Sequence, residues 1–206
     1  MRDHLRAGIA VYNAGEYHAA HDAWEDYWLD LDRGTDDERL LHGLIQFTAA
    51  VHHAAERNWA GAAGLVESAS GYLAGLPDEY RGVDVAAVRT HLSELGADPE
   101  RIERGPAPRL THEGEALSLG DLRFEPAAVA AAVLAEEYER YDADVLRRAA
   151  AYGREDLADG QGTSEFVTLV MDFARDAENR AIIYQRLADH VSRRDRRAAD
   201  VNGLFE

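Results

Sequence analysis

The chain has 206 residues, which is enough for one sizeable domain or for a domain with an extension. It contains no cysteine, which excludes disulfides, a thiol nucleophile and a cysteine metal site. Its net charge of −17, with no basic patch before the Arg-rich end, argues against nucleic acid or an anionic membrane as a partner. The sequence shows neither a secretory signal nor the roughly 18–20 apolar residues of a membrane helix, so we expect a cytoplasmic protein.

Helical patterns dominate the first half of the sequence. The expected helices cover residues 2–12, 16–30, 38–56, 59–75 and 84–95. Gly15 lies in the turn that ends the first helix, Thr35 or Asp36 can cap the third, and Pro77 ends the fourth. The helix at 38–56 is apolar on most sides, which is typical of a helix buried in a bundle.

The residue composition changes after residue 95. Residues 96–124 are rich in Pro and Gly and predict a linker or an irregular arm, with short strands at 109–111 and 117–123. Helical patterns then return. The expected helices cover residues 126–140, 142–158, 164–175 and 177–197, with Thr163 or Ser164 as a cap.

These elements predict an all-α protein: a compact helical bundle built from antiparallel helix hairpins, followed by a helical extension. We expect an N-terminal helical domain at residues 1–95, the linker or arm at 96–124 and a C-terminal helical region at 125–206. The broad apolar helices are also compatible with a homodimer.

The strong negative charge leads to a hypothesis of adaptation to high salt. All 22 basic residues are Arg, and the acids are spread over the whole chain. Such a charge makes a compact chain repel itself in dilute salt, whereas molar salt shortens the Debye length to about 3 Å and screens the repulsion. We therefore expect the melting temperature to rise between dilute and molar salt. A GC-rich genome would also favour Arg over Lys, and an unchanged melting temperature would support that alternative.

An unusual polar stripe marks the helix at 16–30. His18, His21, Asp22, Glu25 and Trp28 follow one another at spacings of one or three residues and gather on one side of the helix. This mixture of two imidazoles, two carboxylates and an indole is typical neither of the apolar buried face of a helix nor of its solvent-exposed face. The stripe therefore predicts a functional or structural polar site.

The apolar helix at 38–56 carries a matching stripe. His42, Gln46 and His53 share one face, whereas His52 points about 100° away. If the two helices pair antiparallel, Trp28 lies near His42 and the start of the first stripe lies near His53. The two stripes would then meet.

These side chains offer the nitrogen and oxygen ligands that Zn²⁺, Mn²⁺, Fe²⁺ and Ni²⁺ accept. His21 and Glu25 can reach one ion from a single helix, and His53 is the predicted third ligand. A water on such an ion becomes a nucleophile near neutral pH, and Asp22 or a spare His is predicted to accept its proton. Asp22 or Gln46 is expected to support the ligands. The sequence thus predicts a divalent transition metal as cofactor and an unidentified substrate.

A structural interpretation stays open beside this one. A buried cluster of His, Glu and Gln can be a hydrogen-bond network that only fixes how two helices pair. Residues 15–20 also weakly resemble residues 57–62 at an offset of 42, as in helical repeats. The alternative function is therefore a non-catalytic, repeat-like module that binds a protein partner.

Two sequence blocks resemble a known family. The matching residues are Tyr12-Asn13, Gly15, Tyr17, His21, Asp22, Glu25 and Trp28, then Gly43-Leu44-Ile45-Gln46, His53, Asn58, Gly61 and Ala62. Over about residues 8–75 this pattern resembles the prokaryotic family labelled domain of unknown function 309. The resemblance implies a compact all-α fold, and the family is described as predicted metal-dependent hydrolases. Asp22 stands where that family usually has Glu, and His18 stands where an aromatic residue is usual.

Overall fold

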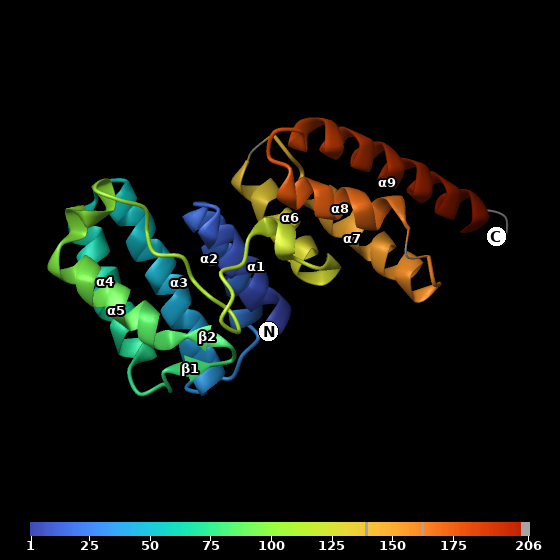
Figure 1. Cartoon of the computed structure of the whole chain (residues 1–206). Helices are drawn as coiled ribbons and strands as arrows, with labels where there is room; N and C mark the ends of the chain where they lie inside the picture. The colour runs from blue at the N-terminus through green and yellow to red at the C-terminus, as the bar shows by residue number, and fades with distance from the viewer. Residues whose placement is uncertain (139, 162, 203–206) are drawn as a thin grey trace. The chain divides into compact units, whose positions relative to one another are not determined.

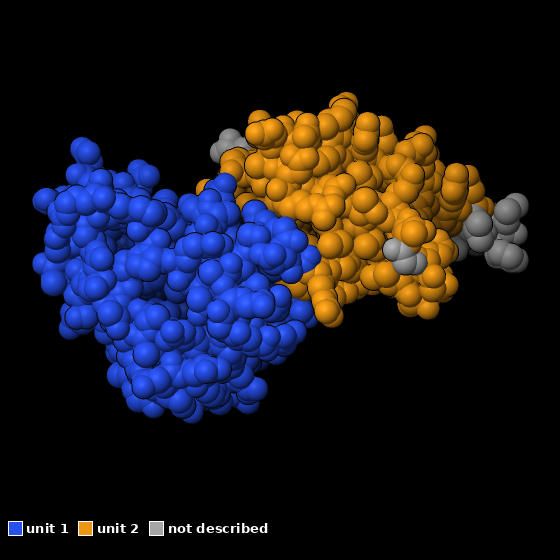
Figure 2. Space-filling view, viewed as in Figure 1, with its two compact units in different colours: residues 1–122 blue, residues 123–206 orange. Residues whose placement is uncertain are grey.

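The computed structural model describes residues 1–138, 140–161 and 163–202, of which residues 201 and 202 by their backbone alone (Figure 1). The chain divides into two compact units, residues 1–122 and 123–206, coloured separately in Figure 2. Most of the segment predicted as a linker or an irregular arm, residues 96–122, therefore lies within the first unit. Position 139 of the helix predicted at 126–140, and residues 203–206 of the predicted C-terminal region, lie outside the described residues.

Unit 1 contains the five helices predicted for the first half of the chain. They are α1 (Arg2–Asn13), α2 (Tyr17–Trp28), α3 (Asp36–Ala55), α4 (Trp59–Leu73) and α5 (Val85–Ala97). The hydroxyl of Thr35 accepts a hydrogen bond from the Glu38 amide and caps α3, while the side chain of Asn58 caps α4 in the same way. The all-α prediction is confirmed.

The helices α1 to α4 run antiparallel in succession, as side-chain contacts between their opposite ends show. Near the start of α1, the His4 ring donates to the carbonyl oxygen of Ala23 in the second half of α2 at 3.0 Å. The ring of Trp28 at the end of α2 lies 4.5 Å from that of His42 in the first half of α3. His42 in turn stacks on Tyr72 near the end of α4, with 3.7 Å between the ring centres. The predicted hairpins are therefore present.

Close approach of α1 and α2 depends on a glycine. Trp24 is fully buried, and a Cβ at Gly8 would lie 2.2 Å from its indole nitrogen. The same relation recurs between α3 and α4, where a Cβ at Gly43 would lie 2.5 Å from Leu73. Large apolar groups of one helix thus rest on glycines of the preceding helix, which lets the helix axes come close.

The predicted strands at 109–111 and 117–123 are wrong. The strands of unit 1 are instead β1 (Glu79–Tyr80) and β2 (Val83–Asp84), which pair antiparallel. His112 forms single bridges to Val83 and to Glu115, so this part of the chain reaches the small sheet through one residue rather than through a strand.

The rest of the irregular segment packs on the helices. It contains two 3₁₀ turns, η1 (Pro99–Glu103) and η2 (Leu119–Asp121). The Asn13 side chain donates to the carbonyl oxygens of Leu110 and Leu117, both at 2.9 Å, and accepts from the Leu110 amide. Leu110 and Leu117 are buried. A polar side chain at the end of α1 therefore replaces the missing strand pairing.

The described residues of unit 2 form a bundle of four helices. They are α6 (Phe124–Glu137), α7 (Ala143–Ala158), α8 (Glu165–Arg175) and α9 (Arg180–Asn202). The core gathers the large apolar side chains that these helices turn inward: Leu134, Leu146, Phe166, Val170, Phe173, Ile183, Leu187 and Val191. None of the described helices in either unit combines the length and the apolar character that spanning a bilayer needs.

A buried carboxylate connects three helices of unit 2. Asp156, near the end of α7, accepts hydrogen bonds from the Ser164 hydroxyl that caps α8 and, at 2.5 Å, from Arg194 of α9. Burial alone would raise the pKa of the Asp156 carboxyl, but these two donors outweigh burial and lower it. The carboxylate is therefore held in its ionised form.

Candidate functional site

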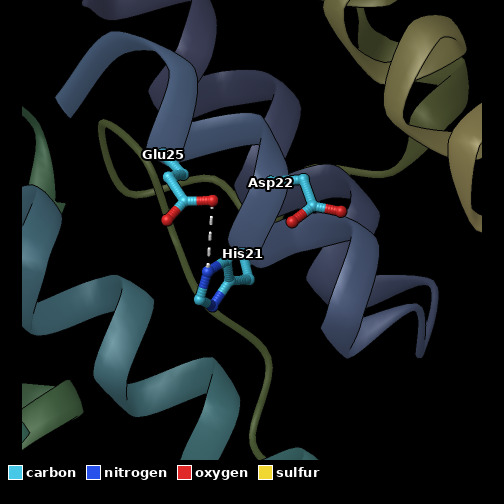
Figure 3. Close-up of side chains that lie close together, drawn as sticks. All are labelled: His21, Asp22 and Glu25. Carbon is cyan, nitrogen blue, oxygen red and sulfur yellow. Dashed lines mark ion pairs between the residues drawn. The ribbon is translucent and has the colours of Figure 1, made fainter. Parts of the chain in front are cut away.

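The polar stripe of α2 places three potential metal ligands together. His21, Asp22 and Glu25 each offer one ligand atom, and these atoms all lie within 4.8 Å of one another. The Nε2 atom of His21 lies 3.6 Å from a carboxylate oxygen of Glu25, one helical turn further on, and Figure 3 shows these two side chains facing each other. All three residues are half-buried. Helix geometry alone accounts for this grouping.

Two more histidines extend the stripe toward α3. The Nδ1 atom of His18 lies 3.8 Å from an oxygen of Asp22, and its ring centre lies 6.3 Å from that of His21. Across the helix pair, the ring centre of His52 on α3 lies 6.0 Å from that of His18. The imidazole of α3 that faces the stripe is therefore His52, which the sequence predicted to point elsewhere.

His53, the predicted third ligand, does not join this group. Its Nδ1 atom accepts a hydrogen bond from the Asn58 side chain at 2.7 Å, so its ring faces the start of α4. Consecutive helix residues point about 100° apart, and the rotation of α3 turns His52 toward α2 and His53 toward α4. The structure thus brings together His21, Glu25 and Asp22 of the predicted site. Metal binding by these residues stays a prediction.

The other end of the seam between α2 and α3 is a satisfied hydrogen-bond network. Glu38, which is 8% exposed, accepts from the indole N–H of Trp28 at 3.0 Å, from Nδ1 of His42 at 3.2 Å and from the Gly34 amide at 3.3 Å. The predicted meeting of Trp28 and His42 is confirmed. Gln46 lies half-buried one turn beyond His42 on α3.

The central residue of this network, Glu38, is not among the site residues that the sequence predicted. Burial alone would raise the pKa of its carboxyl, but the hydrogen bonds from Trp28, Gly34 and His42 outweigh burial and lower it. Two signals could have identified Glu38: its position three residues after the Thr35 cap, and its position one turn before His42.

The donor set of the α2 stripe fits a divalent transition metal. One imidazole nitrogen and two carboxylate oxygens are ligands that Zn²⁺, Mn²⁺ and Fe²⁺ accept, and three protein ligands leave a position open for water or substrate. Partial exposure of all three side chains gives a ligand access to the group.

Comparison with known proteins shows which proteins the segment around the stripe resembles. An uncharacterized protein of Aquifex aeolicus (strain VF5) is 30% identical to this chain over 91 residues, which are 44% of this chain and 27% of that protein. Residues 5–65, which include all of α2 and α3, match the family described as "Domain of unknown function (DUF309)". The segment that carries both sequence motifs is therefore similar to this family, as the motifs predicted.

Proposed function

We propose that unit 1 binds a divalent transition metal on α2 and acts as a metal-dependent hydrolase. The observation that supports this proposal is the convergence of the His21, Asp22 and Glu25 ligand atoms within 4.8 Å. His21 and Glu25 supply one nitrogen and one oxygen from adjacent turns of the same helix. A bound ion of this kind lowers the pKa of a water molecule toward about 7 and so supplies a nucleophile at neutral pH.

The residues around the pair have separate roles in this proposal. Asp22 is close enough to serve either as a third ligand or as the acceptor of a proton from the water. The Glu38 network holds α2 and α3 together one turn beyond Glu25, because Trp28 and His42 bind the same carboxylate from the two helices. The stripe is thereby supported by a fixed helix pair.

Metal titration tests the proposal. Untagged protein treated with a chelator is titrated with Zn²⁺, Mn²⁺, Fe²⁺ and Ni²⁺ by calorimetry, and hydrolysis of phosphate esters, carboxylic esters and amides is measured with the preferred ion. We expect His21→Ala and Glu25→Ala to weaken binding by at least 10- to 100-fold, a loss roughly typical even of residues that only support a ligand. Hydrolysis should fall with binding.

Asp26→Asn is the matched control for this titration. Asp26 is exposed, adjoins Glu25 on the same helix and carries the same charge. Equal losses in Asp26→Asn and Glu25→Ala would mean that the ion responds to the general negative charge, and the proposal would then fail. Metal binding without hydrolysis of any substrate would support the metal site and contradict the proposed hydrolase activity.

The alternative is a non-catalytic module that binds a protein partner. It is supported by the Glu38 network, in which Trp28 of α2 and His42 of α3 bind one carboxylate and so link the two helices without any ligand. Wild-type protein that binds none of the four ions would favour this alternative.

A further inference from the structure

A second set of metal-ligand side chains adjoins the α2 group and includes a residue of α3. The rings of His18 of α2 and His52 of α3 lie near each other across the helix pair, with their planes tilted by 53°, and Asp22 lies beside His18. Neither histidine belongs to the group of His21, Asp22 and Glu25. Two imidazoles from different helices therefore meet next to a carboxylate that already lies close to another candidate site.

The distances between the rings allow two imidazoles to share an ion. A metal about 2.0–2.1 Å from an imidazole nitrogen lies about 3.2 Å from the ring centre, so two rings on one ion have centres at most about 6.4 Å apart. The rings of His18 and His52 are 6.0 Å apart. A tetrahedral angle brings ring centres to about 5 Å, and the His18 side chain, which is 60% exposed, has room for the small rotation required.

We propose that His18, Asp22 and His52 form a second metal position beside the first, with Asp22 shared between the two. This inference rests on the proposed function, because it assigns Asp22 to ligation rather than to proton acceptance. One oxygen of Asp22 lies 3.8 Å from Nδ1 of His18, and an Asp22 ligand atom also lies within 4.8 Å of the ligand atoms of His21 and Glu25. A carboxylate has two oxygens, so one side chain can serve both positions. Paired metal positions of this kind occur in phosphatases, nucleases and aminopeptidases.

The arrangement also explains why His52 rather than His53 is the proposed ligand. His53 has its Nδ1 atom engaged by Asn58 at the start of α4, whereas the His52 ring faces α2. The two residues are chemically identical neighbours on one helix and both are half-buried. They therefore form a matched pair of variants for testing the second position.

The test is the number of ions bound per chain. Untagged, chelator-treated protein is loaded with Zn²⁺, dialysed and measured by elemental analysis, alongside calorimetric titration with Zn²⁺. We expect two ions per chain in the wild type, one in His52→Ala and two in His53→Ala. His21→Ala should lose the tighter or the weaker ion but keep the one that depends on His52.

Each outcome distinguishes this inference from the proposed function. If the wild type binds one ion that is lost in His21→Ala and retained in His52→Ala, the first metal position is supported and the second is overturned. No ion in the wild type overturns both. Two ions that persist in His52→Ala place the second ion elsewhere and also overturn the inference.

A spectroscopic measurement on the wild type tests the same assignment without any variant that could misfold. In the wild type, zinc titration should shift the side-chain nitrogen resonances of His18 and His52 in nuclear magnetic resonance spectra and leave Nδ1 of His53 in place. Shifts of the His53 ring without shifts of His52 would contradict the assignment, whatever the variants do.

Discussion

Replacing Trp24 by alanine should lower the free energy of unfolding of unit 1 by about 3–5 kcal/mol, the range for large aromatic residues removed from a core. Trp24 is fully buried and rests on Gly8, so its removal leaves a space between α1 and α2 that the helices cannot fill without losing other contacts. Denaturant unfolding followed by fluorescence measures the effect. Trp28 and Trp59 remain as reporters, and both lie in unit 1.

Two further variants check the reason for this loss. Trp24→Phe keeps an aromatic ring and removes an indole N–H that has no hydrogen-bond partner among the described residues, so it should cost clearly less than alanine. Gly8→Ala should cost about 1–3 kcal/mol because its methyl group would overlap the indole. A Trp24→Ala loss below about 1 kcal/mol would contradict the packing described for α1 and α2.

Asp156→Ala should lower the stability of unit 2 by about 1–3 kcal/mol, the range for leaving buried polar partners unsatisfied. The substitution leaves the Ser164 hydroxyl and the Arg194 guanidinium without their shared acceptor. Because all three tryptophans lie in unit 1, far-ultraviolet circular dichroism reports both units, whereas fluorescence reports unit 1 alone. The variant should shift the first signal and leave the fluorescence transition in place.

The contribution of Asp156 should also depend on pH with a defined sign. The folded-state pKa of this carboxyl lies below its ordinary value of 3.8. The stabilisation is therefore complete above that ordinary value and is lost as the pH falls toward the folded-state pKa. Asp156→Asn lacks this dependence, so the stability difference from the wild type should shrink between about pH 6 and about pH 3. The exposed Asp159→Asn is the control, and an equal effect in both variants would contradict the prediction.

The helices of this protein were predictable because their signals are local. Thr35 and Asn58 cap α3 and α4 through their own side chains, and Ser164 caps α8 in the same way, so each boundary is written within a few residues of sequence. The strands were not predictable in this way. β1 and β2 are two residues each, and the segment around His112 is held by Asn13, which lies about a hundred positions earlier in the chain.

The candidate site divides along the same line. The His21–Glu25 pair follows from the period of a single helix, and the structure contains it. The choice between His52 and His53 depends instead on the rotation of α3 about its axis, which packing against α2 and α4 decides. A rotation of about 100° exchanges the two residues, and the sequence of α3 alone does not specify that angle.

The central position of α3 has a consequence for the order in which unit 1 opens. This helix packs against α2, α4 and η1, so its backbone amides are shielded on several sides. Amide protons in such a position exchange with solvent mainly through the largest opening of the unit, while those of peripheral turns exchange through local fraying. We therefore expect the α3 amides to be among the slowest of unit 1 to exchange, and in the proposed second metal position His52 would be the ligand on the more rigid helix.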